Sequence, residues 1–222
     1  MSERCKVCSG KTVEIKYDNI KSNYHRCEVC AFISKDPACY VSHEEAFVIY
    51  DRHENQIGDP LYEAYFIDFI ETWISNFKAQ SREALDFGSG PVPVLAHILK
   101  HKYAFEVDIY DKYYAPEKVF KGKQYDLITL TEVLEHLPDP MWYFELFRSL
   151  LKPGGMIAVM TQFHHRDDAA FKHWHYRRDE SHVSFFTPET MTHIAEQFNL
   201  RITYMDTHKI VVFQRIDSYE ID

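Results

Sequence analysis

The sequence lacks the features that would place this chain in a membrane or on nucleic acid. No run of about 18 or more apolar residues occurs, so no segment is long enough for a transmembrane helix. Positive charge is scarce, because 25 Lys and Arg stand against 34 Asp and Glu, a formal net charge of -9. Since phosphate binding usually needs a basic face, this balance disfavours nucleic acid as a partner.

The chain also lacks a secretion signal at its start and shows no internal repeat. Its first residues, Met-Ser-Glu-Arg-Cys, contain no apolar signal core, which predicts a cytoplasmic protein whose thiols stay reduced. A length of 222 residues favours one domain, or one domain with a small appendage. A chain of this length buries roughly 70% of its unfolded surface, which is enough for a real core.

Four of the five cysteines have the spacing of a metal site. Cys5 and Cys8 form one C-x-x-C pair. Cys27 and Cys30 form another, with 18 residues between the pairs (27 − 8 − 1). This spacing matches a zinc signature, and two such turns can place four thiolates around one ion. Because four protein ligands leave no open position, we predict a structural zinc with no catalytic role.

A redox pair or an iron site is the alternative for these cysteines. One C-x-x-C would suffice for redox work, so the second pair favours zinc. Residues 12–17 and 31–33 have the pattern of short strands. Residues 1–40 are therefore expected to form a zinc-ribbon-like module, and Cys39 is expected to be a plain thiol outside it.

Residues 41–80 are expected to form a helical cover over the rest of the protein. Apolar and aromatic residues recur at three- and four-residue spacing from Tyr62 to Phe77. Pro60 lies near the start of this helix, where proline is tolerated. Tyr50 and His53, which precede it, are alternatively candidates for a lid over a ligand.

From residue 83 onward, predicted strands alternate with predicted helices. Alternation of this kind predicts an α/β fold in which helices cover both faces of a mostly parallel sheet. Thr187 is expected to cap the last helix. The expected strands are residues 84–87, 105–110, a short one near 119, 125–131, 156–161 and an antiparallel pair at 200–204 and 210–215; the expected helices are residues 94–101, 141–151 and 188–198.

A glycine-containing turn follows the first of these strands, in Leu85-Asp86-Phe87-Gly88-Ser89-Gly90. Ligands of such sheets bind outside the carboxyl ends of the strands. Glycines there let the backbone approach a ligand, and the N-terminus of the next helix favours a negative group. By itself, however, a G-x-G is more often a simple turn between a strand and a helix.

An acidic residue at the end of the second strand strengthens the ligand interpretation. Asp111 lies 25 residues after Asp86 (111 − 86), and its carboxylate can accept both hydroxyls of a ribose, as an acidic residue does in dinucleotide folds. Asp108 is three residues earlier on the same strand. Because side chains alternate along a strand, Asp108 should face the other way. We therefore predict Asp111 as the ribose ligand.

Three motifs together resemble class I S-adenosylmethionine-dependent methyltransferases. Residues 85–90 are similar to the first motif of that family, residues 125–137 (YDLITLTEVLEHL) to its fourth-strand motif, and residues 151–155 (LKPGG) to the turn before its fifth strand. They occur in the family's order within residues 83–216. The resemblance implies a Rossmann-like, seven-stranded sheet and S-adenosylmethionine as methyl donor. Paired cysteines before such a domain also resemble zinc-containing C-methyltransferases of deoxysugar biosynthesis.

The resemblance also implies which residues bind the cofactor. In order along that molecule they are Asp86, Gly88, Ser89 and Gly90 around the methionine portion, Asp111 at the ribose, Lys112 near the adenine, and Thr131 and Glu132 beside the amino-acid part. The chain departs from the family at the third glycine of the first motif, where Val92 stands between two prolines. The third-strand region is short, so no adenine-binding acid is assigned.

Dinucleotide-dependent dehydrogenases share the logic of this fold. They usually need G-x-G-x-x-G, and here Pro93 occupies the position of the last glycine. The methyltransferase interpretation is therefore favoured.

Two histidines are the candidates for acid–base chemistry. Methyl transfer from a sulfonium is an in-line displacement in which much of the catalysis is positioning, and an oxygen or carbon acceptor also needs a base to take its proton. His136 follows the fourth strand, and His182 lies in an aromatic-rich loop after the fifth. We predict that they take the acceptor's proton or orient the acceptor. His164 and His165 are expected at the same edge.

A second metal site is an open alternative for this region. Glu132, Glu135 and His136 have i, i+3, i+4 spacing, which would put them on one face of a helical turn. Carboxylates with imidazole suit magnesium or manganese, and His182 could complete the set. Ubiquinone-pathway O-methyltransferases and small-RNA 2′-O-methyltransferases carry similar Glu-x-x-Glu-His runs and bind metal there, but so do relatives with no known metal.

The sequence thus predicts a zinc module (1–40), a helical cover (41–80) and a methyltransferase domain (81–222) that acts on a small-molecule acceptor by O- or C-methylation. Residues 163–186 would build the acceptor pocket. An RNA or protein methyltransferase is one alternative, which the net charge of -9 disfavours. A non-catalytic S-adenosylmethionine-binding scaffold is another. The acceptor and the oligomeric state do not follow from the sequence.

Overall fold

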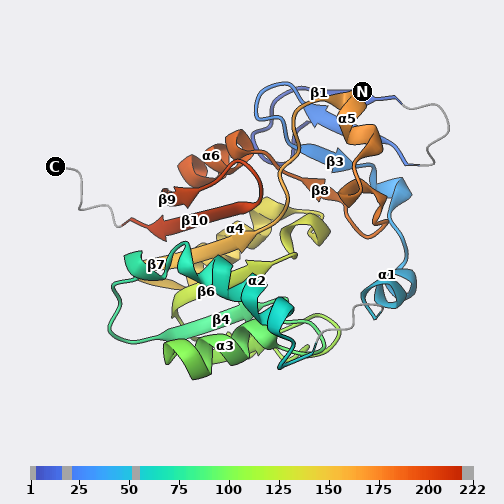
Figure 1. Ribbon diagram of the computed structural model, residues 1–222. Helices are drawn as coiled ribbons and strands as arrows, with labels where there is room; N and C mark the ends of the chain where they lie inside the picture. The colour runs from blue at the N-terminus through green and yellow to red at the C-terminus, as the bar shows by residue number, and fades with distance from the viewer. Residues whose placement is uncertain (1–3, 17–21, 52–55, 217–222) are drawn as a thin grey trace.

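The computed structural model describes residues 4–16, 22–51 and 56–216. Within these residues a six-stranded sheet in the order β5-β4-β6-β7-β10-β9 forms the larger part of the structure (Figure 1). Strands β4 to β7 are parallel, and β10 runs antiparallel to both β7 and β9. The strands are β4 (Glu83–Phe87), β5 (Glu106–Tyr110), β6 (Tyr125–Thr131), β7 (Leu151–Met160), β9 (Leu200–Met205) and β10 (Ile210–Arg215).

Helices cover both faces of this sheet, as predicted. Strand side chains alternate between the faces, so Leu127 packs with α2 and α3 whereas its neighbour Ile128 packs with α4 and α6. Helix α6 begins where expected, because Thr187 Oγ1 accepts a hydrogen bond from Thr190 N at 3.2 Å. The helices are α2 (Pro60–Glu71), α3 (Val94–Tyr103), α4 (Pro140–Leu150) and α6 (Pro188–Gln197).

The seven-stranded expectation is wrong for the described residues, since the strand expected near Val119 is absent there. Residues 111–122 form turns instead, because the Asp111 carboxylate accepts hydrogen bonds from the backbone N–H groups of Tyr113 and Tyr114. Strand β5 is therefore an edge of the sheet. Strand β7 also begins five residues earlier than expected, at Leu151 rather than Met156, and includes the Lys-Pro-Gly-Gly segment.

The N-terminal residues form a second, antiparallel sheet in the order β1-β2-β3-β8 (Figure 1). Strand β1 (Thr12–Ile15) was expected, although Tyr17 lies outside the described residues. Strand β2 (Tyr24–Cys27) was not predicted. The strand expected at 31–33 is displaced to β3 (Ile33–Lys35), because Ala31 has a left-handed backbone with φ 61°. The fourth strand, β8 (Ser184–Phe185), comes from the far end of the chain.

Short helices connect these parts. Helix α1 (His43–Tyr50) starts with a capping box between Ser42 and Glu45, and α2 starts at Pro60 as predicted. His53, one of the two lid candidates, lies outside the described residues. No described helix combines the length and the apolar character that crossing a membrane requires. The remaining short helices are α5 (Asp168–His173), η1 (Pro37–Cys39), η2 (Ile74–Asn76), η3 (Leu134–His136) and η4 (Tyr176–Arg178).

Candidate functional site

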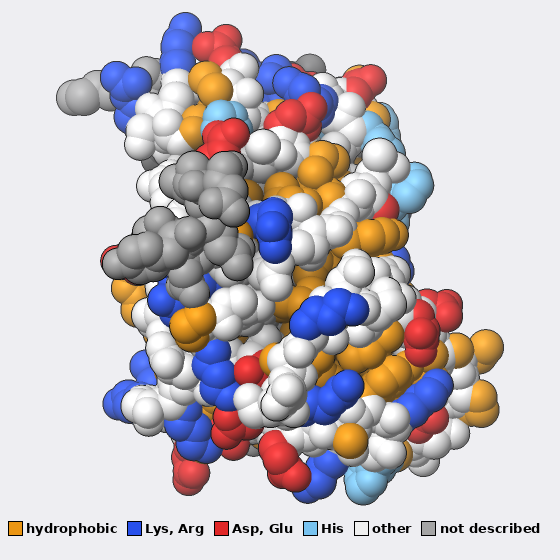
Figure 2. Space-filling model, turned by 90° about the vertical axis from the view of Figure 1, so that its left-hand side faces the viewer, with side chains coloured by type: hydrophobic (Ala, Val, Ile, Leu, Met, Phe, Trp, Pro, Cys, Tyr) orange, Lys and Arg blue, Asp and Glu red, His pale blue; other side chains and the backbone are white. Residues whose placement is uncertain are grey.

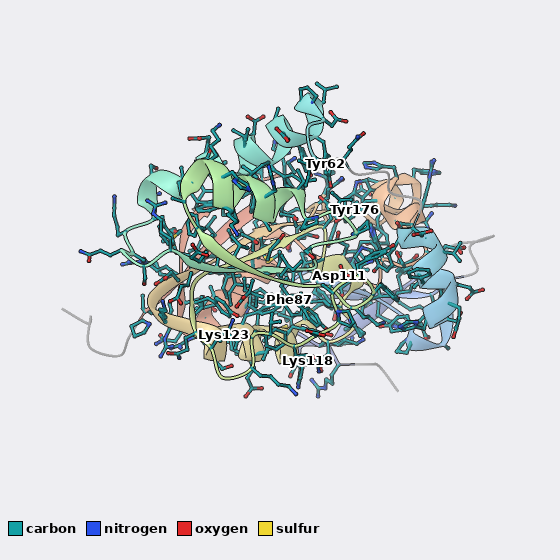
Figure 3. All side chains as sticks on the ribbon, turned by 90° about the horizontal axis from the view of Figure 1, so that it is seen from below. Tyr62, Phe87, Asp111, Lys118, Lys123 and Tyr176 are labelled. Atoms are coloured by element: carbon teal, nitrogen blue, oxygen red, sulfur yellow. The ribbon has the colours of Figure 1, made fainter. Side chains whose placement is uncertain are left out.

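A cavity of about 1040 Å³ lies at the carboxyl ends of β4, β5 and β6. Pockets for one small ligand measure about 300–1000 Å³, so this one has room for a cofactor and an acceptor side by side. Tyr62, Asp111 and Tyr176 line it and project near one another in Figure 3, whereas Lys123 lies beyond Phe87. All eight predicted cofactor-binding residues and both predicted catalytic histidines line this cavity.

The turn after β4 has a backbone that only glycine accommodates well. Gly88 and Gly90 have φ values of 86° and 68°. A Cβ on Gly88 would lie 2.2 Å from Val133 Cγ2, whereas nothing lies within 4 Å of the position that a Cβ on Gly90 would take. Ser89 Oγ is buried with no hydrogen-bond partner in the described part of the chain. The turn therefore offers open backbone and an unused polar atom, which fits a bound ligand.

Asp111 joins this turn to the end of β5. Its Oδ2 accepts a hydrogen bond from Gly90 N at 3.0 Å. As predicted, Asp108 faces the other way, where Lys123 Nζ and Tyr125 OH each lie 2.6 Å from its Oδ2. A carboxylate has about four lone-pair sites, and three backbone N–H groups already occupy Asp111. One site stays available for a ribose hydroxyl, fewer than the two hydroxyls expected from sequence.

Asp86 lies at the buried end of the part of the cavity next to β4 and β5, and Lys112 lies at its exposed end. Asp86 is 2% exposed, and its Oδ1 accepts a hydrogen bond from Thr129 Oγ1 at 2.9 Å. Burial raises the pKa of Asp86 to about 6. Lys112 is exposed, with its Nζ 5.1 Å from the centroid of the Tyr113 ring. Asp86 thus supports the floor of the cavity, and Lys112 lies at its rim.

Glu132 connects the helical cover to the loop after β7. It has a left-handed backbone with φ 54°, which is uncommon for a residue with a side chain and is often found at functional sites. Its carboxylate accepts hydrogen bonds from Tyr65 OH at 3.2 Å and Tyr176 OH at 2.8 Å. Thr131, one residue earlier, ends β6 at the cavity wall.

The expectation that Glu132 shares a face with Glu135 and His136 is wrong. The left-handed backbone at Glu132 and the tighter 3-10 turn of η3 break the helical spacing on which it depended. Instead, Glu135, His136 and His182 come together, with ligand atoms within 4.8 Å of one another. The rings of His136 and His182 are 4.6 Å apart.

Backbone carbonyls orient both histidine rings. His136 Nδ1 lies 3.3 Å from Ser181 O, and His182 Nδ1 lies 2.7 Å from Tyr176 O. A carbonyl oxygen only accepts, so each Nδ1 carries a proton, and in the neutral ring Nε2 is then the nitrogen with the lone pair. His136 Nε2 is 3.9 Å from Glu135 Oε1. A tautomer set in this way is typical of histidines that bind a metal or accept a proton.

Glu135 is completely buried next to these rings. Its exposed fraction is 0%, and its Oε2 accepts a hydrogen bond from Thr161 Oγ1 at 2.8 Å. Among the described residues its Oε1 has no hydrogen-bond partner. Burial holds the pKa of Glu135 well above its ordinary value. A buried carboxylate is costly unless it is paired, so this atom needs a proton or a cation.

The four paired cysteines converge as the spacing predicts. Cys5 Sγ lies 3.6 Å from Cys30 Sγ, and Cys8 Sγ lies 3.4 Å from Cys27 Sγ. Tetrahedral zinc with Zn–S bonds of about 2.3 Å needs sulfurs about 3.8 Å apart, so the set fits. A Cβ on Gly10 would lie 3.2 Å from the sulfurs of Cys8 and Cys27, which explains a glycine there.

The expected segment 163–186 supplies part of the cavity wall, through His175, Tyr176, Asp179 and His182. Its phenylalanines are buried, and Phe186 packs on Phe32 of the N-terminal sheet at 5.3 Å. His164 and His165 do not line the cavity either. Sequence reasoning missed Asp179, whose Oδ2 is 3.8 Å from His182 Nε2. Tyr50, a lid candidate, and Tyr176, within the predicted segment, line the cavity with five tyrosines that sequence reasoning missed, although the three-residue spacing in α2 was a signal; these five are Tyr62, Tyr65, Tyr113, Tyr114 and Tyr143.

Comparison with known proteins identifies the domain. The family model described as "Methyltransferase domain" matches residues 61–204, which is 144 of 222 residues (204 − 61 + 1). The "Ubiquinone biosynthesis O-methyltransferase" of Dinoroseobacter shibae is 30% identical over 125 residues, covering 52% of this chain and 49% of that protein. The protein of the same name from Ruegeria pomeroyi is 36% identical over 76 residues, covering 34% and 30%. The chain thus spans about half the length of the first relative and less of the second.

Two solved structures share the fold at low sequence identity. The plantazolicin methyltransferase BpumL, in complex with a pentazolic desmethylPZN analog and SAH, has a TM-score of 0.54 at 14% identity, covering 78% of this chain and 91% of that one. The mitomycin 7-O-methyltransferase MmcR has a TM-score of 0.51 at 12% identity, covering 77% and 60%. At these identities the likeness shows the fold alone.

Proposed function

The chain belongs to the methyltransferase domain family, and from this premise we propose that it transfers a methyl group from S-adenosylmethionine to a small-molecule acceptor. The observation that carries the proposal is the single cavity of about 1040 Å³, which joins the glycine turn and Asp111 to the histidine pair. The names of the relatives support a small acceptor and O-methylation. The cavity is open rather than plugged, which argues against a non-catalytic scaffold.

The cofactor would occupy the half of the cavity at β4 and β5. The open backbone at Gly90 and the unused Ser89 Oγ would receive its methionine portion, while Asp111 would hold a ribose hydroxyl. Glu132 would border the amino-acid part, and Lys112 would lie near the adenine. When bound, this cofactor supplies a reactive methyl group, so the protein's own task is positioning.

The acceptor would lie between the tyrosine wall and the histidine pair. In its neutral form each histidine has its lone pair on Nε2, because a backbone carbonyl holds the proton on Nδ1. His136 or His182 would then take the acceptor's proton, or orient the acceptor, as the methyl group is transferred. Deprotonation of a hydroxyl is the step that such a base assists most directly, so O-methylation is favoured over C-methylation.

One observation favours a divalent metal as a second possibility at the same place. The Oε1 of Glu135 is buried with no hydrogen-bond partner in the described structure, and the ligand atoms of Glu135, His136 and His182 lie within 4.8 Å of one another. One carboxylate and two imidazoles suit manganese or zinc, and Asp179 stands next to His182. The two versions differ in one respect: after chelation, only the metal version predicts that manganese, which thiolate sites bind poorly, restores activity without added zinc.

The four cysteines would hold one structural zinc. Backbone N–H groups of Val7 and Val29 point at Cys5 Sγ (3.4 Å) and Cys27 Sγ (3.3 Å), which stabilises thiolates. The cluster supports the zinc-ribbon-like interpretation, whereas the likeness to sugar-type C-methyltransferases has no support beyond it.

Transfer of a deuterated methyl group tests the proposed function. The protein is incubated with methyl-deuterated S-adenosylmethionine and a cell extract divided into small molecules, RNA and protein. We expect label in the small-molecule fraction, where mass spectrometry then identifies the acceptor. Label in RNA or protein would support the macromolecular alternative. Figure 2 already shows basic and acidic side chains interspersed on one face, with no continuous basic patch there for a phosphate backbone.

A further inference from the structure

We propose that the zinc-ribbon-like module (residues 4–40) is a working part of the acceptor half of the site. In this inference, zinc at the four cysteines holds the segment 163–187, which carries Asp179 and His182, in its active position. The cofactor half does not depend on it. The inference rests on the proposed methyl transfer for its functional meaning, but its structural link can be measured without an acceptor.

The strongest link is a backbone connection through Val183. Lys35 N, in β3 of the module, donates a hydrogen bond to Val183 O at 2.9 Å. Val183 N in turn donates to Glu135 O at 2.7 Å. The residue next to His182 is therefore held between the module on one side and Glu135 on the other. Pairing of β3 with β8 continues this connection over Ser184.

The turn with the second cysteine pair forms hydrogen bonds with residues at both ends of the segment. Cys30 O accepts a hydrogen bond from Thr190 Oγ1 at 2.8 Å, just past the segment's end. Ala31 O lies 2.9 Å from His164 Nε2, at its start. Metal binding to such turns is itself folding free energy, so the geometry of these two carbonyls depends on the metal. The contacts with this segment thus come from the zinc ligand Cys30 itself and from its neighbour Ala31.

Side chains add two further connections. Arg26 of β2 binds Asp168 of α5 through two hydrogen bonds, of 2.8 and 3.2 Å. Lys35 is buried, and its Nζ donates to Glu180 O at 2.8 Å, one residue from Asp179. A bidentate arginine pair is geometrically specific, and a buried ammonium is costly unless paired. Both contacts therefore define where the segment lies.

A cluster of aromatic side chains packs between the module and the ring of His182. Tyr24 of β2 packs on Phe171 at 5.3 Å, and Trp174 packs on Tyr176 at 5.1 Å within the same cluster. Tyr176 lies 4.3 Å from the ring of His182. Since protein interiors transmit displacement through close packing, loosening the module should move His182. The cofactor half is instead held by β4 within the large sheet, between β5 and β6.

Metal depletion of the intact protein tests the inference. Zinc-loaded and chelator-treated protein are compared by hydrogen exchange and by calorimetry with S-adenosylhomocysteine. We expect exchange in residues 168–186 to become at least about tenfold faster after depletion, because these residues lose contacts that the module makes with them. The dissociation constant of S-adenosylhomocysteine should stay within about twofold. Added zinc should restore the exchange rates.

A matched pair of arginine variants tests the same link with the metal in place. Arg26→Gln removes the ion pair between module and segment, and Arg166→Gln removes a more exposed pair, with Glu189, that does not involve the module. We expect Arg26→Gln alone to speed exchange in residues 168–183 about fivefold and to shift the emission of Trp174 to longer wavelength. Arg26→Lys should recover part of the protection.

Two outcomes would overturn the inference. One is unchanged exchange in residues 168–186 after zinc is lost. The other is a parallel loss of cofactor affinity, which would make the module a general folding element. Once the acceptor is identified, Arg26→Gln should raise the acceptor KM about 5- to 100-fold and leave the cofactor KM unaltered. Failure of methyl transfer would reject the proposed function only, because exchange and calorimetry need no acceptor.

Discussion

The two halves of the cavity are built in different ways. The cofactor half comes from neighbouring parallel strands, and one hydrogen bond from Gly90 N to Asp111 closes it across 21 positions of chain. The acceptor half comes from three distant regions: the helical cover, the end of β6 and the loop after β7, and the N-terminal module contacts that loop. Its contacts span up to 160 positions, as between Thr190 and Cys30.

This difference separates binding from chemistry. A strand–turn–helix unit presents the cofactor residues wherever the large sheet forms, because the sheet's core fixes the strand ends. The acceptor residues need long-range contacts, which a metal site can strengthen or release. We therefore expect a perturbation of one half to leave the other largely intact, and the predictions below test that separation.

The largest effect is expected from loss of the zinc. Cys27→Ser should abolish binding of about one zinc per chain and lower the free energy of unfolding by several kcal/mol, since structural zinc sites contribute on the order of 10 kcal/mol of binding free energy. Elemental analysis measures the zinc content, and urea unfolding measures the free energy of unfolding. Cys39→Ser is the matched control and should change neither. Metal-free protein whose thiols all titrate readily would contradict the prediction.

The next largest effect is expected from the two histidines proposed as catalytic. His136→Ala and His182→Ala should each slow turnover about 10²- to 10⁴-fold, as expected for loss of a general base, with cofactor affinity nearly unchanged. Exposed His165→Ala is the control. Manganese added after chelation distinguishes the metal version, because it would restore activity through Glu135, His136 and His182 but would not replace zinc at the four cysteines. Full activity in both variants would mean that neither histidine acts as a base and that the protein accelerates methyl transfer by positioning alone.

Two buried groups, Asp86 under the cofactor half and His164 at the contact between module and segment, should also respond oppositely to acid. Burial raises the pKa of Asp86 to about 6, so its destabilising effect is full above that pH and is relieved as pH falls toward 4. Burial lowers the pKa of His164 to about 4, so its stabilising effect is full above about pH 6.5 and is lost over the same range. Each shift corresponds to about 3 kcal/mol.

Urea unfolding at about pH 7 and about pH 4.5 can separate these contributions. In the native protein, protonation of Asp86 in acid recovers some stability. Asp86→Asn has no such group, so this variant should lose more stability in acid than the native protein does. In the native protein, acid costs stability because unfolding lets His164 bind a proton. His164→Gln cannot bind that proton and can still donate to Ala31 O, so this variant should lose less stability in acid than the native protein does. The same pH response in both variants would show that neither carboxyl nor imidazole titrates as its burial implies.

The smallest effect is expected in the cofactor half. A hydrogen bond to a charged acceptor contributes roughly 1.5 to 3 kcal/mol, so Asp111→Ala should weaken cofactor binding about tenfold to a hundredfold. Asp108→Ala should do much less, because that carboxylate is bound to Lys123 and Tyr125 on the other side of the strand. Calorimetry decides. A sensitive Asp108 would place the cofactor on the opposite side of β5.

Local patterns were enough to predict much of this protein. The period of apolar residues located β4, β6, α3 and α6, and the capping pattern at Thr187 placed the start of α6. The G-x-G turn and Asp111 were predictable because each acts through its own strand end. The cysteine spacing predicted the cluster, since two C-x-x-C turns have few other ways to pack.

The tertiary structure alone decided the acceptor half. Nothing local in Glu132 announces its left-handed backbone, which turns it from Glu135 toward Tyr65 and Tyr176. Likewise β8, with only two residues, exists because β3 offers it an edge. Sequence by itself determined the elements and the cofactor turn, because their forces act between near neighbours. Which distant side chains meet at His182 depended on packing, because those contacts form only after the whole chain has folded.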